Sequence, residues 1–212
     1  MFELSTKTQV DKHFKMPELY KLIGASKEVK ADAANINSVT LTNVLNRDTM
    51  NLPSVSSVKE IYIFEIELSE KTIPVLFISA LDKAINFHTV FILRHNAETM
   101  LYGTYKEYGE KNIKVGKYYS TEWVVERLIK LPLNVSSLDD IYTAIIDELI
   151  SITARPQEST QAFVVRYDEI LRLQKEIAKL QKLVDNEKQP KKRFELNDKL
   201  KQLKKELKVS NE

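Results

Sequence analysis

Three carboxylates near the middle of the chain have the types and spacing that could do chemistry. Glu65 and Glu67 alternate with apolar residues in EIYIFEIEL, and Asp48 precedes them. Because side chains alternate along a strand, Glu65 and Glu67 should share one face. Grouped carboxylates can hold Mg²⁺ for phosphodiester hydrolysis. One hypothesis is therefore a divergent magnesium-dependent nuclease.

An alternative explains the same glutamates without a metal. The pattern resembles that of nucleases with the restriction-endonuclease fold, but those enzymes usually have a lysine two residues after the strand acid, where this chain has Glu67. Lys71 lies beyond the expected end of the strand. Alternation alone gives a half-exposed strand polar residues on its solvent face. We favour this interpretation and expect no catalytic residues, no metal and no cofactor.

Several other chemistries lack their residues. The chain has four glycines and none of the glycine-rich phosphate-binding motifs, and it has no G-x-S-x-G elbow. It has no cysteine, which excludes disulfides, thiolate zinc sites and thiol nucleophiles. His88 and His95 stand seven residues apart on one expected strand, and His13 is remote from both, so a shared metal is not expected.

Tyrosines and lysines interleave over 102–123, as in proteins that stack bases and bind phosphates. The residues are Tyr102, Tyr105, Lys106, Tyr108, Lys111, Lys114, Lys117, Tyr118, Tyr119 and Trp123. Tyr102 and Tyr105 would face opposite sides of a strand, which divides such a platform. Aromatic residues in strands more often form cores and cross-strand pairs, and we favour that interpretation.

The elements that must position these residues follow an α-β-β-α-β-β-β-α order. Helices are expected after Pro17, after Ser26, from Thr72 as N-cap and from Ser137 as N-cap, and strands in between. This order predicts an α+β fold with a mostly antiparallel sheet packed with helices. We assign the α+β domain to residues 1–154, a linker to 155–162 and a C-terminal helical unit to 163–212.

The C-terminal unit carries leucines and isoleucines at heptad steps of three and four. These packing positions are Ile170, Leu173, Ile177, Leu180, Val184, Leu196, Leu200, Leu203 and Leu207. Pro190 suits the first turn of a new helix better than a helix interior. We predict two helices, about 163–186 and 190–208, that form an antiparallel hairpin, a short coiled coil. One long kinked helix is the alternative.

Positive charge collects in the same segment. Residues 163–212 carry 14 basic and 9 acidic residues, a net charge of +5, whereas the remainder carries −3. A basic cluster at the bend, Lys188, Lys191, Lys192 and Arg193, is the expected contact with a partner or with nucleic acid. A solvated basic helix face is the simpler alternative.

The chain also resembles a bacterial family. The opening MFELSTKTQVDKHFKMPELY, the central LDKAINFHTVFIL, STEW at 120–123 and the tail EKQPKKRFELNDKLKQLKKEL are similar to the family named domain of unknown function 4391. Members tend to be encoded near helicase and DNA-methyltransferase genes of restriction-like or phage-defence loci. The resemblance implies a DNA-related partner and supplies no catalytic residues.

The leading functional hypothesis is a non-enzymatic accessory subunit that docks a helicase or methyltransferase through its C-terminal helices. Direct, sequence-nonspecific nucleic-acid binding by the basic tail is the alternative, and the nuclease is third. A homodimer through the same leucines stays open. The start has no secretory h-region and no stretch reaches the roughly 18 apolar residues of a membrane span, so we expect a cytoplasmic protein without a membrane partner.

Overall fold

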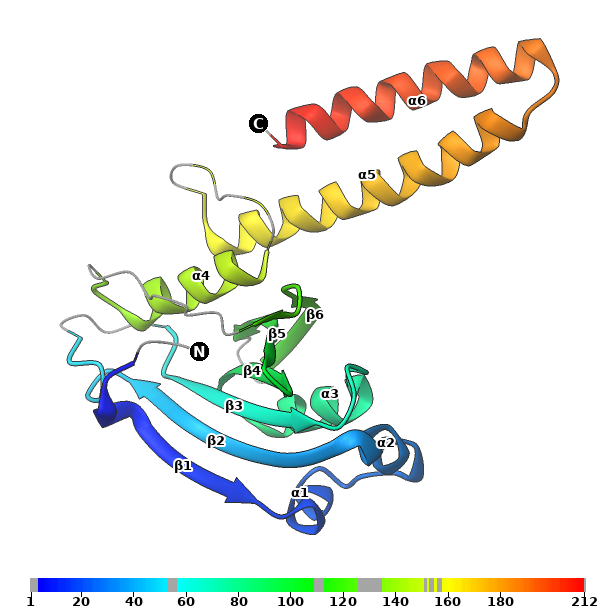
Figure 1. Ribbon diagram of the computed structural model, residues 1–212. Coiled ribbons are helices and arrows are strands. Elements are labelled where there is room, and N and C mark those ends of the chain that lie inside the picture. Colours follow the sequence, from blue (N-terminus) through cyan, green and yellow to red (C-terminus); the bar gives the residue numbers. More distant parts are fainter. Residues whose placement is uncertain are drawn as a thin grey trace. The chain divides into compact units, whose positions relative to one another are not determined.

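The computed structural model describes residues 4–52, 57–108, 113–125, 135–150, 152, 155 and 158–211. The chain divides into two compact units, the sheet unit Met1–Ser151 and the hairpin unit Ile152–Glu212. Figure 1 shows the helices and strands of both units, coloured along the sequence.

The sheet unit is α+β, as the element order predicts. Its strands are β1 (Gln9–Phe14), β2 (Ile36–Asn46), β3 (Glu60–Leu68), β4 (His88–His95), β5 (Glu98–Tyr108), β6 (Ile113–Ser120) and β7 (Val124–Val125). Its α-helices are α1 (Met16–Leu22), α2 (Lys27–Asp32), α3 (Val75–Ala84) and α4 (Leu138–Leu149), with 3₁₀ turns at Thr6–Thr8 and Ala33–Asn35.

The strands form one sheet in the order β1-β2-β3-β4-β5-β6, with β7 paired to β5. All pairs are antiparallel except β3 and β4, which run parallel. Parallel neighbours need a crossover, and α3 supplies it. The prediction of a mostly antiparallel sheet packed with helices is confirmed.

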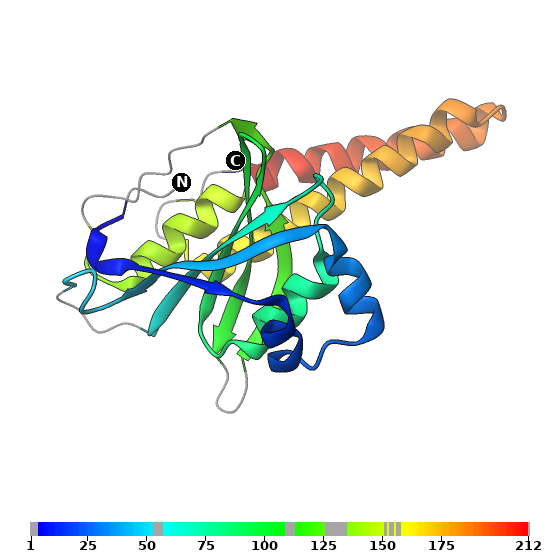
Figure 2. The same cartoon turned by 60° about the horizontal axis from the view of Figure 1, so that its bottom comes forward.

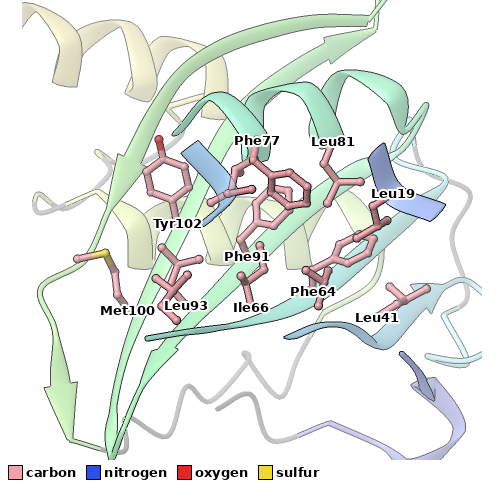
Figure 3. Packing of buried hydrophobic residues seen from close by; sticks show 14 residues of the cluster. Leu19, Leu41, Phe64, Ile66, Phe77, Leu81, Phe91, Leu93, Met100 and Tyr102 are labelled. Carbon is pink, nitrogen blue, oxygen red and sulfur yellow. The ribbon is translucent and has the colours of Figure 1, made fainter. Parts of the chain in front are cut away.

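Helices cover both faces of this sheet (Figure 2). On one face α3 buries Phe77, Ile78 and Leu81 against even-numbered β3 residues such as Phe64 (Figure 3). On the other face α4 approaches β5, where Tyr142 stacks on Tyr105 at 6.1 Å between ring centroids. Burial on both faces explains why β4 reads as a nearly continuous apolar run rather than an alternating one.

Local signals set several element ends. Ser26 caps α2 by accepting a hydrogen bond from Val29 N–H, and Ser137 forms a capping box with Asp140 at α4. The expected N-cap of the third helix is wrong: α3 begins at Val75 after Pro74, not after Thr72. The hairpin between β4 and β5 turns at Asn96, whose φ of 54° suits asparagine.

Strand β1 was not expected from the sequence. QVDKHF is almost wholly exposed and carries three charged or polar residues in a row, which is typical of an edge strand. A bulge interrupts its pairing with β2 between Gln9 and Lys12, and Asp11 there has a φ of 48°. The missing apolar alternation explains why this strand escapes a reading based on periodicity.

The hairpin unit consists of α5 (Thr160–Asn186) and α6 (Pro190–Asn211) (Figure 1). Glu187 has extended φ and ψ angles of −77° and 122°, which ends α5 and excludes one continuous helix. The helices are antiparallel: Arg166, early in α5, donates to the carbonyl of Ser210, late in α6, at 3.1 Å. Each helix extends about three residues beyond an expected end, and the predicted hairpin is confirmed.

Candidate functional site

The predicted packing positions of the hairpin lie on the facing sides of α5 and α6. Ile170, Leu173 and Leu200 are almost fully buried, at 1%, 1% and 4% exposure. Val184 is buried as well. The remaining positions are partly buried, namely Ile177, Leu180, Leu196, Leu203 and Leu207. Residues at heptad positions share one helix face, so such a pair of helices buries them together.

A groove of about 560 Å³ runs along one side of the hairpin, between the two helices. Leu180, Leu183 and Leu203 form its apolar part. Leu183 is 50% exposed, although its neighbour in sequence, Val184, is buried. Leu183 was not expected at a site from the sequence, because it lies one position outside the heptad pattern. The sequence feature that could have indicated it is a large apolar residue directly beside a heptad position.

Charged residues line the groove, and positive charge exceeds negative charge there. Arg172 pairs with Glu169 at 2.6 Å and with Glu176 at 3.1 Å. The hydrogen bond from Arg172 lowers the pKa of Glu169, and the same bond raises the pKa of Arg172. Three further cations, Lys175, Lys179 and Lys199, line the groove without an ion pair to any described residue.

The basic cluster at the bend is exposed throughout. Lys188 lies in the connection between the helices, and Lys191, Lys192 and Arg193 occupy the first turn of α6. Consecutive helical residues point about 100° apart, so these three side chains diverge. A charged contact through this cluster stays a prediction.

The three carboxylates proposed for a nuclease do not come together. Glu65 pairs with Arg94 at 2.9 Å, and Glu67 accepts a hydrogen bond from Ser38 at 3.3 Å. Asp48 follows β2 at the end of the strand where Asn46 pairs with Glu60. Glu60 stands five residues before Glu65 in β3, which is roughly 17 Å along the strand. Within the described ranges, no three His, Asp or Glu side chains are grouped to hold a metal.

A polar cavity of about 520 Å³ lies on the sheet beside Glu65. Asp11 and His13 of β1 and Thr40 of β2 line it, and the Thr40 hydroxyl lies 2.8 Å from Nδ1 of His13. The bulge in β1 brings Asp11 to this cavity. The cavity was not expected from the sequence, because it depends on the unexpected pairing of β1 with β2.

The described tyrosine side chains of 102–119 are buried or partly buried, and Lys106 is buried while Lys117 is exposed, so these side chains do not form a base-stacking platform. Tyr102 and Tyr118 stack on each other at 5.1 Å, and Tyr118 donates to Asp82 at 2.6 Å. Lys106 is buried and pairs with Asp82 at 2.6 Å. Lys111 lies outside the described residues, and so do the side chains of Tyr108 and Lys114. The interpretation of these aromatic residues as core and cross-strand pairs fits their burial.

His88 is also buried beside this segment, at 2% exposure, with its ring 4.1 Å from that of Tyr142. Burial, and after it the positive charge of Lys106, lowers the pKa of His88 to about 4. His95 lies at the other end of β4, where its Nδ1 is 3.0 Å from the carbonyl oxygen of Leu68. The two imidazoles serve separate contacts.

Comparison with known families agrees with the resemblance in the tail and the opening segment. The profile of the family described as Domain of unknown function (DUF4391) matches residues 2–207. The chain belongs to this family. The DUF4391 match spans both units, so the hairpin is part of what the family shares. No curated protein and no solved structure matches the chain.

Among the residues that the structure describes, no helix combines the length and the apolar character needed to cross a bilayer.

Proposed function

We propose that this protein is a non-enzymatic, cytoplasmic interaction subunit whose hairpin groove binds an amphipathic helix of a partner protein. The observation that carries the proposal is Leu183, which lies 50% exposed in an apolar groove among Lys175, Lys179 and Lys199. An exposed leucine between two helices is the position that a third helix would cover.

The groove chemistry defines the partner helix. A third helix can insert apolar side chains between Leu180, Leu183 and Leu203, and each fully buried leucine contributes about 1.5–3 kcal/mol. The lysines along the groove favour acidic residues on both flanks of that apolar ridge. We therefore expect a helix with leucines at heptad spacing and glutamate or aspartate beside them.

The family resemblance suggests where such a helix occurs. Genes of the family tend to stand near helicase and DNA-methyltransferase genes, so a subunit of a restriction-like or phage-defence assembly is the proposed partner. The identity of the partner rests on gene context. The groove supports only the kind of helix that binds, which is an amphipathic helix with acidic flanks. Separate experiments can therefore test the two parts.

The groove can be tested with two synthetic three-heptad peptides that share leucines at a and d. One peptide has glutamate and the other lysine at e and g. Fluorescence anisotropy with the full chain should show binding of the glutamate peptide and at least tenfold weaker binding of the lysine peptide. Leu183→Glu should abolish binding, and joint Lys175→Glu, Lys179→Glu and Lys199→Glu substitution should reverse the preference.

Other results would contradict the proposal. Binding that is the same in the Leu183→Glu variant would place the peptide outside the groove. Light scattering provides a second test: a stable dimer of the full chain that becomes monomeric in Leu183→Glu would show that a second copy fills the groove instead of a partner. Circular dichroism of each variant checks that α5 and α6 remain helical.

A further inference from the structure

The charges of α6 are distributed unevenly around the helix. The helix has eight basic residues and three acidic ones, and it runs Pro190–Asn211. The basic residues are Lys191, Lys192, Arg193, Lys199, Lys201, Lys204, Lys205 and Lys208. The acidic residues are Glu195, Asp198 and Glu206. The positions of these residues around the axis decide which surface a partner would meet.

Five of these cations fall within one sector of about 120° when 3.6 residues make a turn. They are Arg193, Lys201, Lys204, Lys205 and Lys208, and all five are exposed. None of the three acidic residues lies inside this sector. We call these five cations, together with Phe194, the basic stripe; it extends about 22 Å along the helix at 1.5 Å per residue.

The basic stripe and the groove lie on different sides of the hairpin. Lys199, Gln202, Leu203 and Glu206 of α6 line the groove, and no member of the stripe does. Lys204 of the stripe instead donates to the side chain of Gln181 in α5 at 3.3 Å. The stripe is therefore a second surface, independent of the proposed helix-binding groove.

Phe194 is the aromatic member of the stripe. Its side chain is 66% exposed, the highest exposure of any large apolar side chain on α6, and it lies outside the leucine face that contacts α5. Exposed aromatic rings among lysines and arginines are what proteins use to stack on the bases of single strands. With this exposure, packing against the described residues of the hairpin does not explain the position of the ring.

The first turn of α6 also conflicts with helix electrostatics. It contains Lys191, Lys192 and Arg193 and no acidic residue. Cations at the positive N-terminal end of a helix dipole are unfavourable, and anions there are favourable. Residues that lower the stability of the element that contains them are expected where function requires them. A bound polyanion would reverse this unfavourable arrangement.

From the stripe, its exposed ring and this first turn we infer that α6 binds single-stranded nucleic acid, with the five cations on phosphates and Phe194 stacked on a base. Phosphate contacts carry no sequence information, so the binding is sequence-tolerant. An acidic protein surface would also contact the cations, and competition by polyglutamate distinguishes it from a single strand.

The salt dependence of binding gives the first test. Fluorescence anisotropy with a labelled 20-nucleotide single strand should show binding at about 50 mM salt. Each phosphate contact contributes about −0.7 to the slope of log affinity against log salt for single strands. Five contacts therefore predict a slope of about −3.5, a loss of about 100-fold in affinity between about 50 and 200 mM.

Charge-matched variants assign the binding to the stripe. The stripe variant changes four lysines to glutamine: Lys201→Gln, Lys204→Gln, Lys205→Gln and Lys208→Gln. The control variant loses the same charge outside the stripe: Lys175→Gln, Lys179→Gln, Lys182→Gln and Lys199→Gln. All eight lysines are exposed and glutamine keeps helix propensity, so both variants should fold. The stripe variant should lose at least tenfold in affinity and its slope should approach −0.7.

Phe194→Ala tests the stacking contact. It should weaken single-strand binding about tenfold while leaving the salt slope unchanged, because stacking releases no counterions. Leu183→Ala removes a similarly exposed apolar side chain from the groove and serves as the control. It should leave single-strand binding unchanged.

Four results would overturn the inference. The full chain could fail to bind the single strand at about 50 mM salt, or the control variant could lose as much affinity as the stripe variant. Phe194→Ala could leave single-strand affinity unchanged. Finally, polyglutamate of equal charge could compete as well as the oligonucleotide, which would make the stripe a site for acidic protein segments.

Discussion

Lys106 and Asp82 form a charged pair in the interior of the sheet unit, between β5 and α3. The Lys106 ammonium donates three hydrogen bonds: to the Asp82 carboxylate at 2.6 Å, to the Asp82 carbonyl at 3.0 Å and to the Phe87 carbonyl at 2.8 Å. Thr89 and Tyr118 donate to the same carboxylate. Desolvation lowers the pKa of Lys106, and the Asp82 charge opposes this shift. With every donor satisfied, the pair has a structural role in linking α3 to the sheet.

His88, which lies near this pair, should make the stability of the sheet unit depend on pH. Its pKa is lowered to about 4 in the folded chain, against 6.5 in the unfolded chain. The unfolded state therefore binds more protons as pH falls through this window, so stability is full above pH 6.5 and decreases toward pH 4. Urea unfolding should show a loss of about 2 kcal/mol between pH 7.5 and pH 5 from this residue.

His88→Gln provides the comparison for that measurement. Glutamine does not titrate, so the variant should lose less stability than the parent chain over the same pH interval. Equal losses in both proteins would contradict the assignment to His88. Any loss of stability that the substitution itself causes at pH 7.5 cancels, because only the difference between the two pH values enters the comparison.

At the scale of elements, the hairpin separates packing from binding along one helix. Leu173 of α5 is 1% exposed, and Leu183, ten residues later, is 50% exposed. The first contributes to the contact between α5 and α6. The second lies in the groove, where it is available to a partner.

This separation predicts different effects of the same substitution. Leu173→Ala should destabilise the hairpin by about 2–4 kcal/mol, since it removes a buried leucine and leaves a cavity. Leu183→Ala should change stability by less than about 0.5 kcal/mol and should weaken binding of the glutamate peptide. Thermal melts followed at a helix band by circular dichroism measure the first effect. Similar melts for both variants would contradict the assignment of Leu173 to the interior.

At the scale of the whole molecule, the two units differ in what stabilises them. The sheet unit has an internal core of buried residues from β2, β3, β4, β5 and α3. In the described part of the hairpin unit, α5 and α6 pack on each other through an apolar interface. The net charge of the two parts differs as well: residues 163–212 carry more basic than acidic residues, and the remainder of the chain carries more acidic than basic residues.

We therefore expect residues 1–151 expressed alone to unfold cooperatively, because the core of the sheet unit lies within them. Residues 152–212 alone should be only partly helical, since two isolated helices bury little apolar surface. Circular dichroism and urea titration of both fragments test this prediction. A fragment 1–151 without a cooperative transition would show that the two units depend on each other for folding.

Several features of this protein follow from local sequence signals. Heptad steps and Pro190 predict the two helices of the hairpin, because side-chain spacing and the missing proline N–H act within a few residues. The alternation in EIYIFEIEL and the cap at Ser137 predict β3 and α4 for the same reason. Charge counts also predict a basic tail, though not the side on which its cations lie.

Other features depend on tertiary structure. The parallel pairing of β3 with β4, the edge strand β1 and the buried Lys106–Asp82 pair all join segments distant in sequence, so no local signal contains them. The separation of Asp48 from Glu65 belongs here too, since it depends on strand register. The groove exists only because α5 and α6 lie side by side. Residue types and their periods are local properties, whereas which surfaces become buried is decided by the packing of the whole fold.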